Sequence, residues 1–137
     1  MSKVIEIAQK EIGYVEQAGN KTKYGKWFSL DGVAWCAMFV SWCYDKAGKP
    51  LGNLGYLKGF AGCQSGHEYF KKKGWIVTDP QAGDIVLFDF NGDGRFDHTG
   101  MYVAKLTDTT FKSIEGNTSP KNNANGGMVM ERERSFK

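Results

Sequence analysis

One stretch of ten residues, Ala34 to Cys43, constrains the fold of this chain more than any other part of it. Its apolar side chains follow Cys36 at three, four and seven residues, at Phe39, Val40 and Cys43. This spacing places them on one face of a helix, and further apolar residues broaden that face until most of the helix is buried. Glycine and proline at positions 48 and 50 then end it. The stretch therefore predicts a central buried helix with a thiol in its first turn.

The position of Cys36 leaves two interpretations open. A thiol at a helix N-terminus lies near free amide N–H groups and the positive end of the helix dipole, and both lower the pKa of the thiol. The same amides can stabilise an oxyanion after the sulfur has attacked a carbonyl group. In the second interpretation Cys36 is a small buried hydrophobic residue without a chemical role. The helix alone does not distinguish between them.

Length and charge exclude several classes of protein. The chain has 137 residues and a formal net charge of +3. This length predicts one domain with a core of its own, spanning residues 1–137, and the charge is too small to indicate nucleic-acid binding. No apolar run approaches the about 20 residues that cross a bilayer, so no membrane is expected as a partner. The N-terminus turns polar too early for a signal peptide, so we expect synthesis in the cytosol and export, if any, by another route.

The three cysteines predict neither a disulfide framework nor a zinc site. Cys36 and Cys43 lie about two helical turns apart, or about 10 Å, which is too far for a disulfide. The chain has no CxxC pair and two histidines, which makes a structural zinc site improbable. A role for Cys36 as nucleophile predicts that it reacts rapidly with alkylating reagents at mildly acidic pH, and that Cys43 and Cys63 are inert.

Helical patterns come first along the chain and strand patterns follow. A helix is expected over residues 2–11, a loop over 17–32, the helix that begins near Cys36, and a short helix over 66–73. From Trp75 the pattern changes to short runs with turns between them. The expected strands are 75–78, 85–90, 98–106, 109–115 and 128–133. This order predicts an α+β fold, in which helices pack on an antiparallel sheet.

Polar residues of the predicted hairpin over 98–117 converge at one of its ends. With a two-residue loop at 107–108, His98 lies opposite Asn117, and Glu115 lies two residues from Asn117 on the same face. Residues that lie directly opposite point to the same side of a sheet, so these three side chains meet. A loop with an odd number of residues would break this register.

These residues suit the chemistry of a thiol nucleophile. Such a nucleophile needs a base nearby, and the base needs an orienting acceptor. His98 is the imidazole that is well placed for Cys36, and Glu115 or Asn117 can accept a hydrogen bond from its other ring nitrogen and fix the tautomer. A histidine beside a hairpin is by itself compatible with a structural role. The combination with Cys36 favours catalysis.

Four blocks of this sequence resemble those of the CHAP family, the cysteine, histidine-dependent amidohydrolases/peptidases related to the NlpC/P60 group. The blocks are Trp35–Cys43, Gly83–Phe88, His98–Gly100 and Ile114–Asn117. They occur in the family's order and extend over nearly the whole chain. The resemblance implies a minimal papain-like fold, with N-terminal helices packed on an antiparallel sheet of five to six strands.

The resemblance also implies the roles of the site residues. By position, Cys36 is the nucleophile, His98 the general base and acid, and Glu115 the residue that orients His98. Asn117 is implied as an auxiliary polar member of the site. The second oxyanion donor stays unassigned, since no obvious side-chain donor precedes Cys36.

The substrate implied by the resemblance is bacterial peptidoglycan. The bond cleaved is the N-acetylmuramoyl-L-alanine amide or an amide within the stem or bridge peptide, as in phage endolysins and bacterial autolysins. A wall-binding domain in a longer parent protein is an expected partner, although a small complete lysin is equally compatible. Two alternatives stay open: a non-catalytic, calcium-stabilised wall-binding module, and an antibacterial amidase toxin.

A calcium loop is expected directly before His98. Residues 89–97 carry oxygen donors at positions 1, 3, 5 and 9 of an EF-hand-type loop and glycine at position 6. The match is partial because position 12 is glycine instead of glutamate, and because the loop joins two strands. The alternative is an Asx-turn loop without metal. No organic cofactor is expected. The candidate ligands are Asp89, Asn91, Asp93, Arg95 and Asp97.

Overall fold

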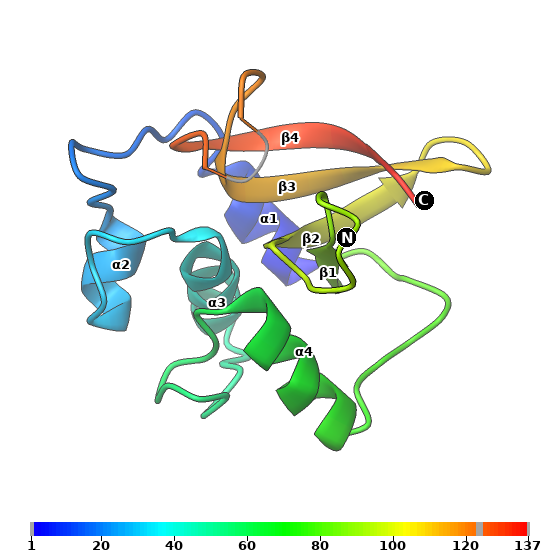
Figure 1. The fold of residues 1–137 in the computed structure, drawn as a ribbon, viewed down its shortest axis with the longest axis horizontal. Coiled ribbons are helices and arrows are strands. Elements are labelled where there is room, and N and C mark those ends of the chain that lie inside the picture. Colours follow the sequence, from blue (N-terminus) through cyan, green and yellow to red (C-terminus); the bar gives the residue numbers. More distant parts are fainter. Residues whose placement is uncertain (1, 123–124, 137) are drawn as a thin grey trace.

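The computed structural model describes residues 2–122 and 125–136, and within them four helices precede four strands (Figure 1). This order confirms the predicted α+β class. The helices are α1 (Lys3–Gln9), α2 (Lys23–Phe28), α3 (Cys36–Lys46) and α4 (Cys63–Lys72). The strands are β1 (Ile85–Phe88), β2 (His98–Lys105), β3 (Thr110–Thr118) and β4 (Met128–Ser135). In the described ranges, no helix has the length and apolar character that a membrane span requires.

The sheet is smaller than the five to six strands expected. In the described part of the chain it has four strands in the order β1-β2-β3-β4, and all neighbours are antiparallel. The strand predicted over 75–78 is wrong: Ile76 and Val77 have the residue types of a strand, but they are 53% and 61% exposed and pair with no neighbouring strand. β-Branched residues suit a strand only where a partner backbone is in reach.

Helix α2 lies inside the segment that was predicted as a loop. Thr22 caps it, because its side-chain oxygen accepts a hydrogen bond from the Gly25 amide at 2.9 Å. Ser29 ends it in the left-handed conformation, at φ 69°. Glycine and lysine suggested a loop here, but burial of Tyr24 and Phe28 against the core outweighs the weak local propensity.

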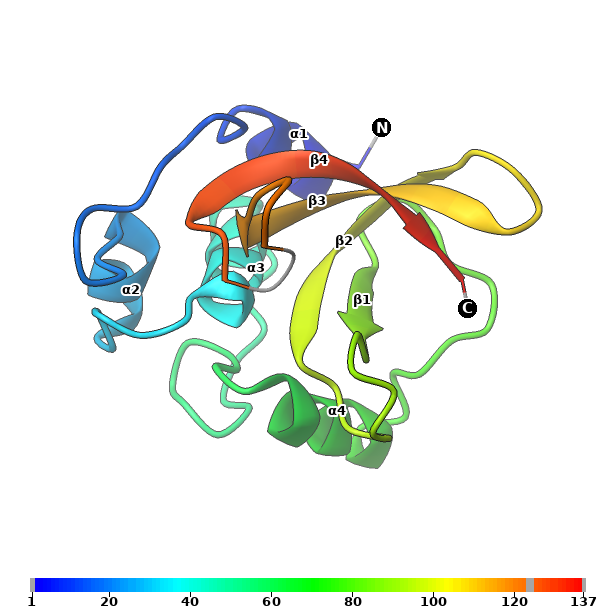
Figure 2. The same ribbon diagram turned by 45° about the horizontal axis from the view of Figure 1, so that its top comes forward.

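Helix α3 lies at the centre of the core, as predicted. Six consecutive residues from Cys36 to Ser41 are buried, and the helix packs against α1, α2, β2 and β3 (Figure 2). Gly116 allows this close packing on β3. A Cβ atom at Gly116 would lie 2.8 Å from side-chain atoms of both Phe39 and Trp35. The Glu-Gly-Asn block therefore contains glycine because the helix needs that space.

The β2–β3 hairpin reaches its predicted register by a different route. Near the site, Met101 pairs with Ile114, as a two-residue loop would require, but near the turn Lys105 pairs with Phe111, one residue out of that register. The loop between the strands is therefore odd in length, and an irregularity between Tyr102 and Ala104 inserts one extra residue into β2. The irregularity compensates for the loop, so the faces of the strands at the site are those predicted.

Candidate active site

Cys36 is the first residue of α3, and its thiol is almost completely buried, with 6% of the residue exposed. The preceding residue, Trp35, occupies the N-cap position and forms no side-chain cap hydrogen bond. Its indole instead donates to Glu16 at 2.9 Å and stacks on Tyr24. No N-cap side chain therefore competes for the free amide N–H groups of the first turn, which form the positive end of the helix dipole.

His98 is the first residue of β2 and is fully buried. Its ring packs against Phe88 and Phe90, with centroids 5.8 and 5.6 Å away, which restricts the orientation of the imidazole. Nε2 lies 2.9 Å from Glu115 Oε1. Nδ1 is buried and has no hydrogen-bond partner among the described residues. With Nε2 engaged by the carboxylate, Nδ1 is the nitrogen available to the Cys36 sulfur.

Glu115 is a fully buried carboxylate that three side chains hold in place. It accepts hydrogen bonds from His98 and from the Ser113 hydroxyl. Arg134 binds it at two points, with Nε 2.8 Å from Oε2 and Nη2 2.5 Å from Oε1. A bidentate guanidinium is the strongest partner that a buried carboxylate can have, so Glu115 has one orientation and keeps its charge.

Arg134 was missed by the sequence analysis. It lies on β4, and its guanidinium also packs over the ring of Phe90, 4.8 Å from the centroid. The signal was weak, because Arg134 stands in an alternating run of charges, Glu131 to Arg134, that is typical of a solvated strand. Only the pairing of β4 with β3 brings this charge to Glu115.

The three site residues shift one another's pKa values toward an ion pair. Interaction with Cys63 and then with His98 holds the pKa of Cys36 well below its ordinary value, in spite of burial. Burial alone would lower the pKa of His98, but its interactions with Cys36 and Glu115 outweigh burial and raise that pKa to about 9. Burial is likewise outweighed at Glu115, where Arg134 and His98 lower the pKa to about 2. These three shifts all favour a thiolate, an imidazolium and a carboxylate in the site.

Gly100 leaves the space through which Glu115 reaches His98. A Cβ atom at Gly100 would lie 2.5 Å from Glu115 Cγ and 2.9 Å from the backbone oxygen of Ile114. The side chain of Glu115 therefore crosses the neighbouring strand at the one residue that has no side chain. The His-Thr-Gly block thus contributes both the imidazole and the gap beside it.

Asn117 holds a loop in this structure. Its backbone is left-handed at φ 58°. Its side-chain oxygen accepts a hydrogen bond from the Gly127 amide at 3.1 Å, and its nitrogen donates to Asn125 at 3.2 Å. These bonds join the two ends of the segment between β3 and β4. An auxiliary role for Asn117 in catalysis stays a prediction, separate from the Cys36–His98–Glu115 contacts.

The loop 89–97 is closed by hydrogen bonds between its carboxylates and its own backbone amides. Asp89 accepts from the amides of Gly92, Asp93 and Gly94 at 2.8–3.3 Å. Asp97 accepts from the amides of Phe90 and Asn91 in the same way. In the ranges that the structure describes, no three His, Cys, Asp or Glu side chains are grouped to hold a metal ion. The carboxylates of the loop are engaged by its own amides in this arrangement, and catalysis by Cys36, His98 and Glu115 does not depend on the loop holding an ion.

Calcium binding stays a prediction that titration tests directly. The hard oxygen donors predict one site, with heat of binding in calorimetry and a melting temperature that calcium raises and EGTA lowers. Asp93→Asn should weaken binding, because Asp93 is a candidate ligand whose loss removes one negative charge. Asp108→Asn, in an exposed turn away from the loop, is the matched control. If no heat is released and EGTA leaves the melting temperature unchanged, the loop binds no calcium and is held by the hydrogen bonds between its carboxylates and its amides.

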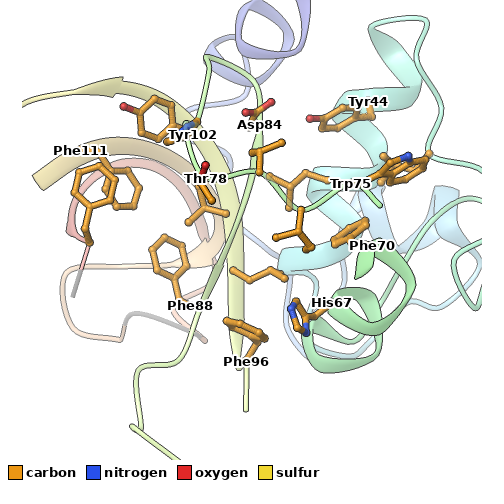
Figure 3. A pocket seen from close by; sticks show the side chains of 18 of the residues that line it. Tyr44, His67, Phe70, Trp75, Thr78, Asp84, Phe88, Phe96, Tyr102 and Phe111 are labelled. Carbon is orange, nitrogen blue, oxygen red and sulfur yellow. The ribbon is translucent and has the colours of Figure 1, made fainter. Parts of the chain in front are cut away.

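A separate apolar pocket of about 710 Å³ lies beside the site. Figure 3 shows Tyr102 and Phe111 at one end of it and Phe70 and Trp75 at the other. Phe88 lines this pocket and also stacks on His98, so its ring forms a wall between the two. Cys36 and His98 do not line the pocket. This hollow is therefore distinct from the residues that carry the proposed chemistry.

The fold and the site together define an α+β domain with a thiol at a helix N-terminus and a histidine–carboxylate pair on adjacent antiparallel strands. Comparison with protein families gives the particular family: the model of the CHAP domain matches residues 28–117, which is more than half of the chain. The chain belongs to the CHAP domain family. The matched range includes Cys36, His98 and Glu115, whereas Arg134 lies beyond it. Domains of this family are generally amidohydrolases or peptidases that act on peptidoglycan. No curated protein and no solved structure matches the chain.

Proposed function

We propose that this chain is a peptidoglycan hydrolase that cleaves an amide bond with a Cys36–His98–Glu115 thiol mechanism. One observation carries the proposal: the buried His98 has Nε2 2.9 Å from Glu115, its other nitrogen is not engaged by any described residue, and its pKa is coupled to that of Cys36. A structural histidine needs neither an orienting carboxylate nor a neighbouring thiol. The same order of groups, nucleophile, base and orienting acid, recurs in unrelated hydrolases because acyl transfer requires it.

The reaction proceeds by acyl transfer. The Cys36 thiolate attacks the carbonyl carbon of the amide, and the oxyanion that forms accepts a hydrogen bond from the Cys36 amide at the start of α3. The His98 imidazolium then gives its proton to the leaving amine as the carbon–nitrogen bond breaks, which leaves a thioester on Cys36. A water molecule next gives a proton to neutral His98 and attacks the thioester. The carboxylic acid departs, and the thiolate–imidazolium pair is restored.

Glu115 and Arg134 act by orienting and charging the imidazole. Glu115 stays ionised throughout, since its pKa of about 2 lies far below that of His98. It stabilises the imidazolium and keeps one ring nitrogen facing away from the sulfur. Arg134 holds the carboxylate from the opposite side. The need to orient and charge His98 therefore explains why the sheet contains the buried carboxylate of Glu115.

Peptidoglycan is the substrate that family membership and charge favour. The net charge of +3 suits an anionic wall polymer. We infer synthesis in the cytosol, action on the wall after release, and a role as the catalytic domain of a phage endolysin or autolysin. A wall-binding domain in the parent protein is part of this proposal.

Mass spectrometry of digested cell walls tests the proposed function. Purified walls treated with the protein should release fragments with one new amine and one new carboxyl terminus at a defined amide bond, and Cys36→Ala should release none. The new termini distinguish the muramoyl–alanine bond from a bond in the stem or bridge peptide. Sedimentation with walls without new amino groups would overturn the proposal and favour a binding module. New reducing ends would indicate glycan cleavage, which this site does not explain.

A further inference from the structure

A second cysteine lies against the nucleophile. The sulfur atoms of Cys36 and Cys63 are 4.0 Å apart, and both residues are buried, at 6% and 8% exposed. Each is the first residue of its helix, Cys36 of α3 and Cys63 of α4. Two helix N-termini therefore meet at this pair of sulfur atoms, and both dipoles favour negative charge there. Catalysis by Cys36, His98 and Glu115 as described above leaves the second sulfur without a role.

The segment before α4 is attached to α3 by specific contacts. The Ser41 hydroxyl accepts a hydrogen bond from the Phe60 amide and lies within hydrogen-bond distance of the Phe60 carbonyl, both at 3.3 Å. Gly66 of α4 sits directly on the ring of Phe60, where a Cβ atom would clash. Cys63 lies between these two contacts in the sequence, so its position relative to α3 is fixed.

The first turn of α4 is also attached to the loop that carries His98. Phe96 lies two residues before His98, and its amide donates a hydrogen bond to the side-chain oxygen of Gln64 at 2.9 Å. Figures 1 and 2 both show α4 beside the connection between β1 and β2. Cys63 is thus held between the two elements that supply the nucleophile and the base. Its sulfur faces Cys36 because of tertiary contacts on both sides.

The surroundings of the two thiols move their pKa values in opposite directions. Hydrogen bonding to Cys36, together with burial, raises the pKa of Cys63, whereas the pKa of Cys36 is lowered. A thiolate accepts hydrogen bonds and donates none, and a neutral thiol is a weak donor. At a sulfur–sulfur distance of 4.0 Å either thiol could donate, and these opposite pKa shifts favour an S–H of Cys63 directed at the Cys36 sulfur.

We propose that Cys63 is a positioning residue of the active site, whose thiol donates a hydrogen bond to the Cys36 thiolate and holds that sulfur between the two helix N-termini. The effect on turnover rests on the proposed function, but the sulfur–sulfur bond does not. The bond stabilises the free thiolate and is weakened once the sulfur is acylated and loses its charge. Cys63 should therefore set the pH at which the nucleophile becomes active more than its rate when fully ionised.

Alkylation of Cys36 as a function of pH tests this proposal. The rate with iodoacetamide is measured on the Cys36 peptide by mass spectrometry. Cys63→Ala and Cys63→Val remove the donor and should raise the midpoint of the rate profile by about one pH unit or more. Cys63→Ser keeps an O–H donor and should restore most of the wild-type midpoint. Cys43→Ala removes a buried thiol from the same helix and should leave the midpoint unchanged.

The outcomes separate this proposal from a packing role and from the proposed function. If Cys63 only fills space, the alanine and valine variants should be less stable, and the midpoint of their alkylation profiles should stay that of the wild type. An unchanged midpoint in either variant, where its circular dichroism is native, overturns the proposal. A Cys63→Ser variant whose alkylation midpoint stays as high as that of Cys63→Ala also counts against the proposal. Alkylation needs no wall substrate, so a shifted midpoint supports the sulfur pair even where wall digestion shows no product. The acid limb of wall hydrolysis should shift by the same amount as alkylation.

Discussion

Cys36→Ala should abolish the hydrolysis of purified walls while the protein remains folded. Loss of the nucleophile of a thiol or serine hydrolase lowers kcat by about 10⁴- to 10⁶-fold, because the remaining groups have no covalent route to use. The substitution removes one sulfur atom at the start of α3 and leaves the apolar face of that helix intact. We expect a circular dichroism spectrum like that of the wild type. Wall turbidity and released amino groups give the activity.

The matched control for this prediction is Cys43→Ala. Cys43 is a buried cysteine of the same helix, and burial raises the pKa of its thiol. It should keep nearly full activity, with a small loss of stability from the volume removed. A Cys36→Ala protein that still releases amino groups at more than a few per cent of the wild-type rate would refute the assignment of the nucleophile.

The pH dependence of the wild-type enzyme follows from the same ion pair. In the proposed mechanism the active form is thiolate Cys36 with imidazolium His98, so activity should rise as Cys36 ionises, well below the ordinary pKa of a thiol. It falls as His98 loses its proton near pH 9. A plot of kcat/KM against pH should therefore have its alkaline limb near 9. The two apparent pKa values of this profile belong to the coupled Cys36–His98 pair and not to either residue alone.

Glu115→Gln has the second largest expected effect, on both rate and stability. The amide breaks the buried ion pair between Arg134 and Glu115 and removes the carboxylate that pairs with His98. Breaking a buried pair in this way costs about 3–5 kcal/mol of the free energy of unfolding. The rate should fall by about 10²- to 10⁴-fold, because the imidazole loses its orientation and its electrostatic support. Urea unfolding and wall hydrolysis measure the two effects.

The stability of the wild type and of Glu115→Gln should also differ in their pH dependence. The pKa of Glu115 is lowered in the folded protein, from 4.5 to about 2. Its contribution is therefore fully present above about pH 4.5 and is lost as the pH falls toward 2. The glutamine variant lacks this part of the acid dependence. Glu133→Gln, an exposed residue of β4, is the control and should change neither rate nor acid dependence.

Much of the site could be predicted because its signals are local. The helical spacing around Cys36 placed the thiol in the first turn, and α3 begins at that residue. The alternation of strand residues put His98 and Glu115 on one face, and their side chains form a hydrogen bond. The register held although the turn was wrong, because an extra residue in β2 offsets the odd loop. Because the extra residue restores the pairing beyond it, the alternation of side chains between the two faces is as predicted at the end of the hairpin that carries the site.

The errors arose where local pattern and available partners disagree. Residues 75–78 have strand-forming side chains but no neighbouring strand, so the sheet has fewer strands than expected in the described ranges. Residues 23–28 have weak helix propensity but bury Tyr24, and they form α2. In both cases burial and pairing outweighed the preference of the segment itself.

The sequence by itself determined the buried helix, the thiol at its start, and the face shared by the histidine and the glutamate. These follow from periods of 3.6 and 2 residues, which act within one element or between strands joined by a short loop. The tertiary structure alone decided that Arg134 holds Glu115 and that Cys63 meets Cys36. Both contacts join segments 19 and 27 residues apart. Their formation depends on how β4 pairs with β3 and how α4 is anchored to α3, and no local periodicity encodes such pairings.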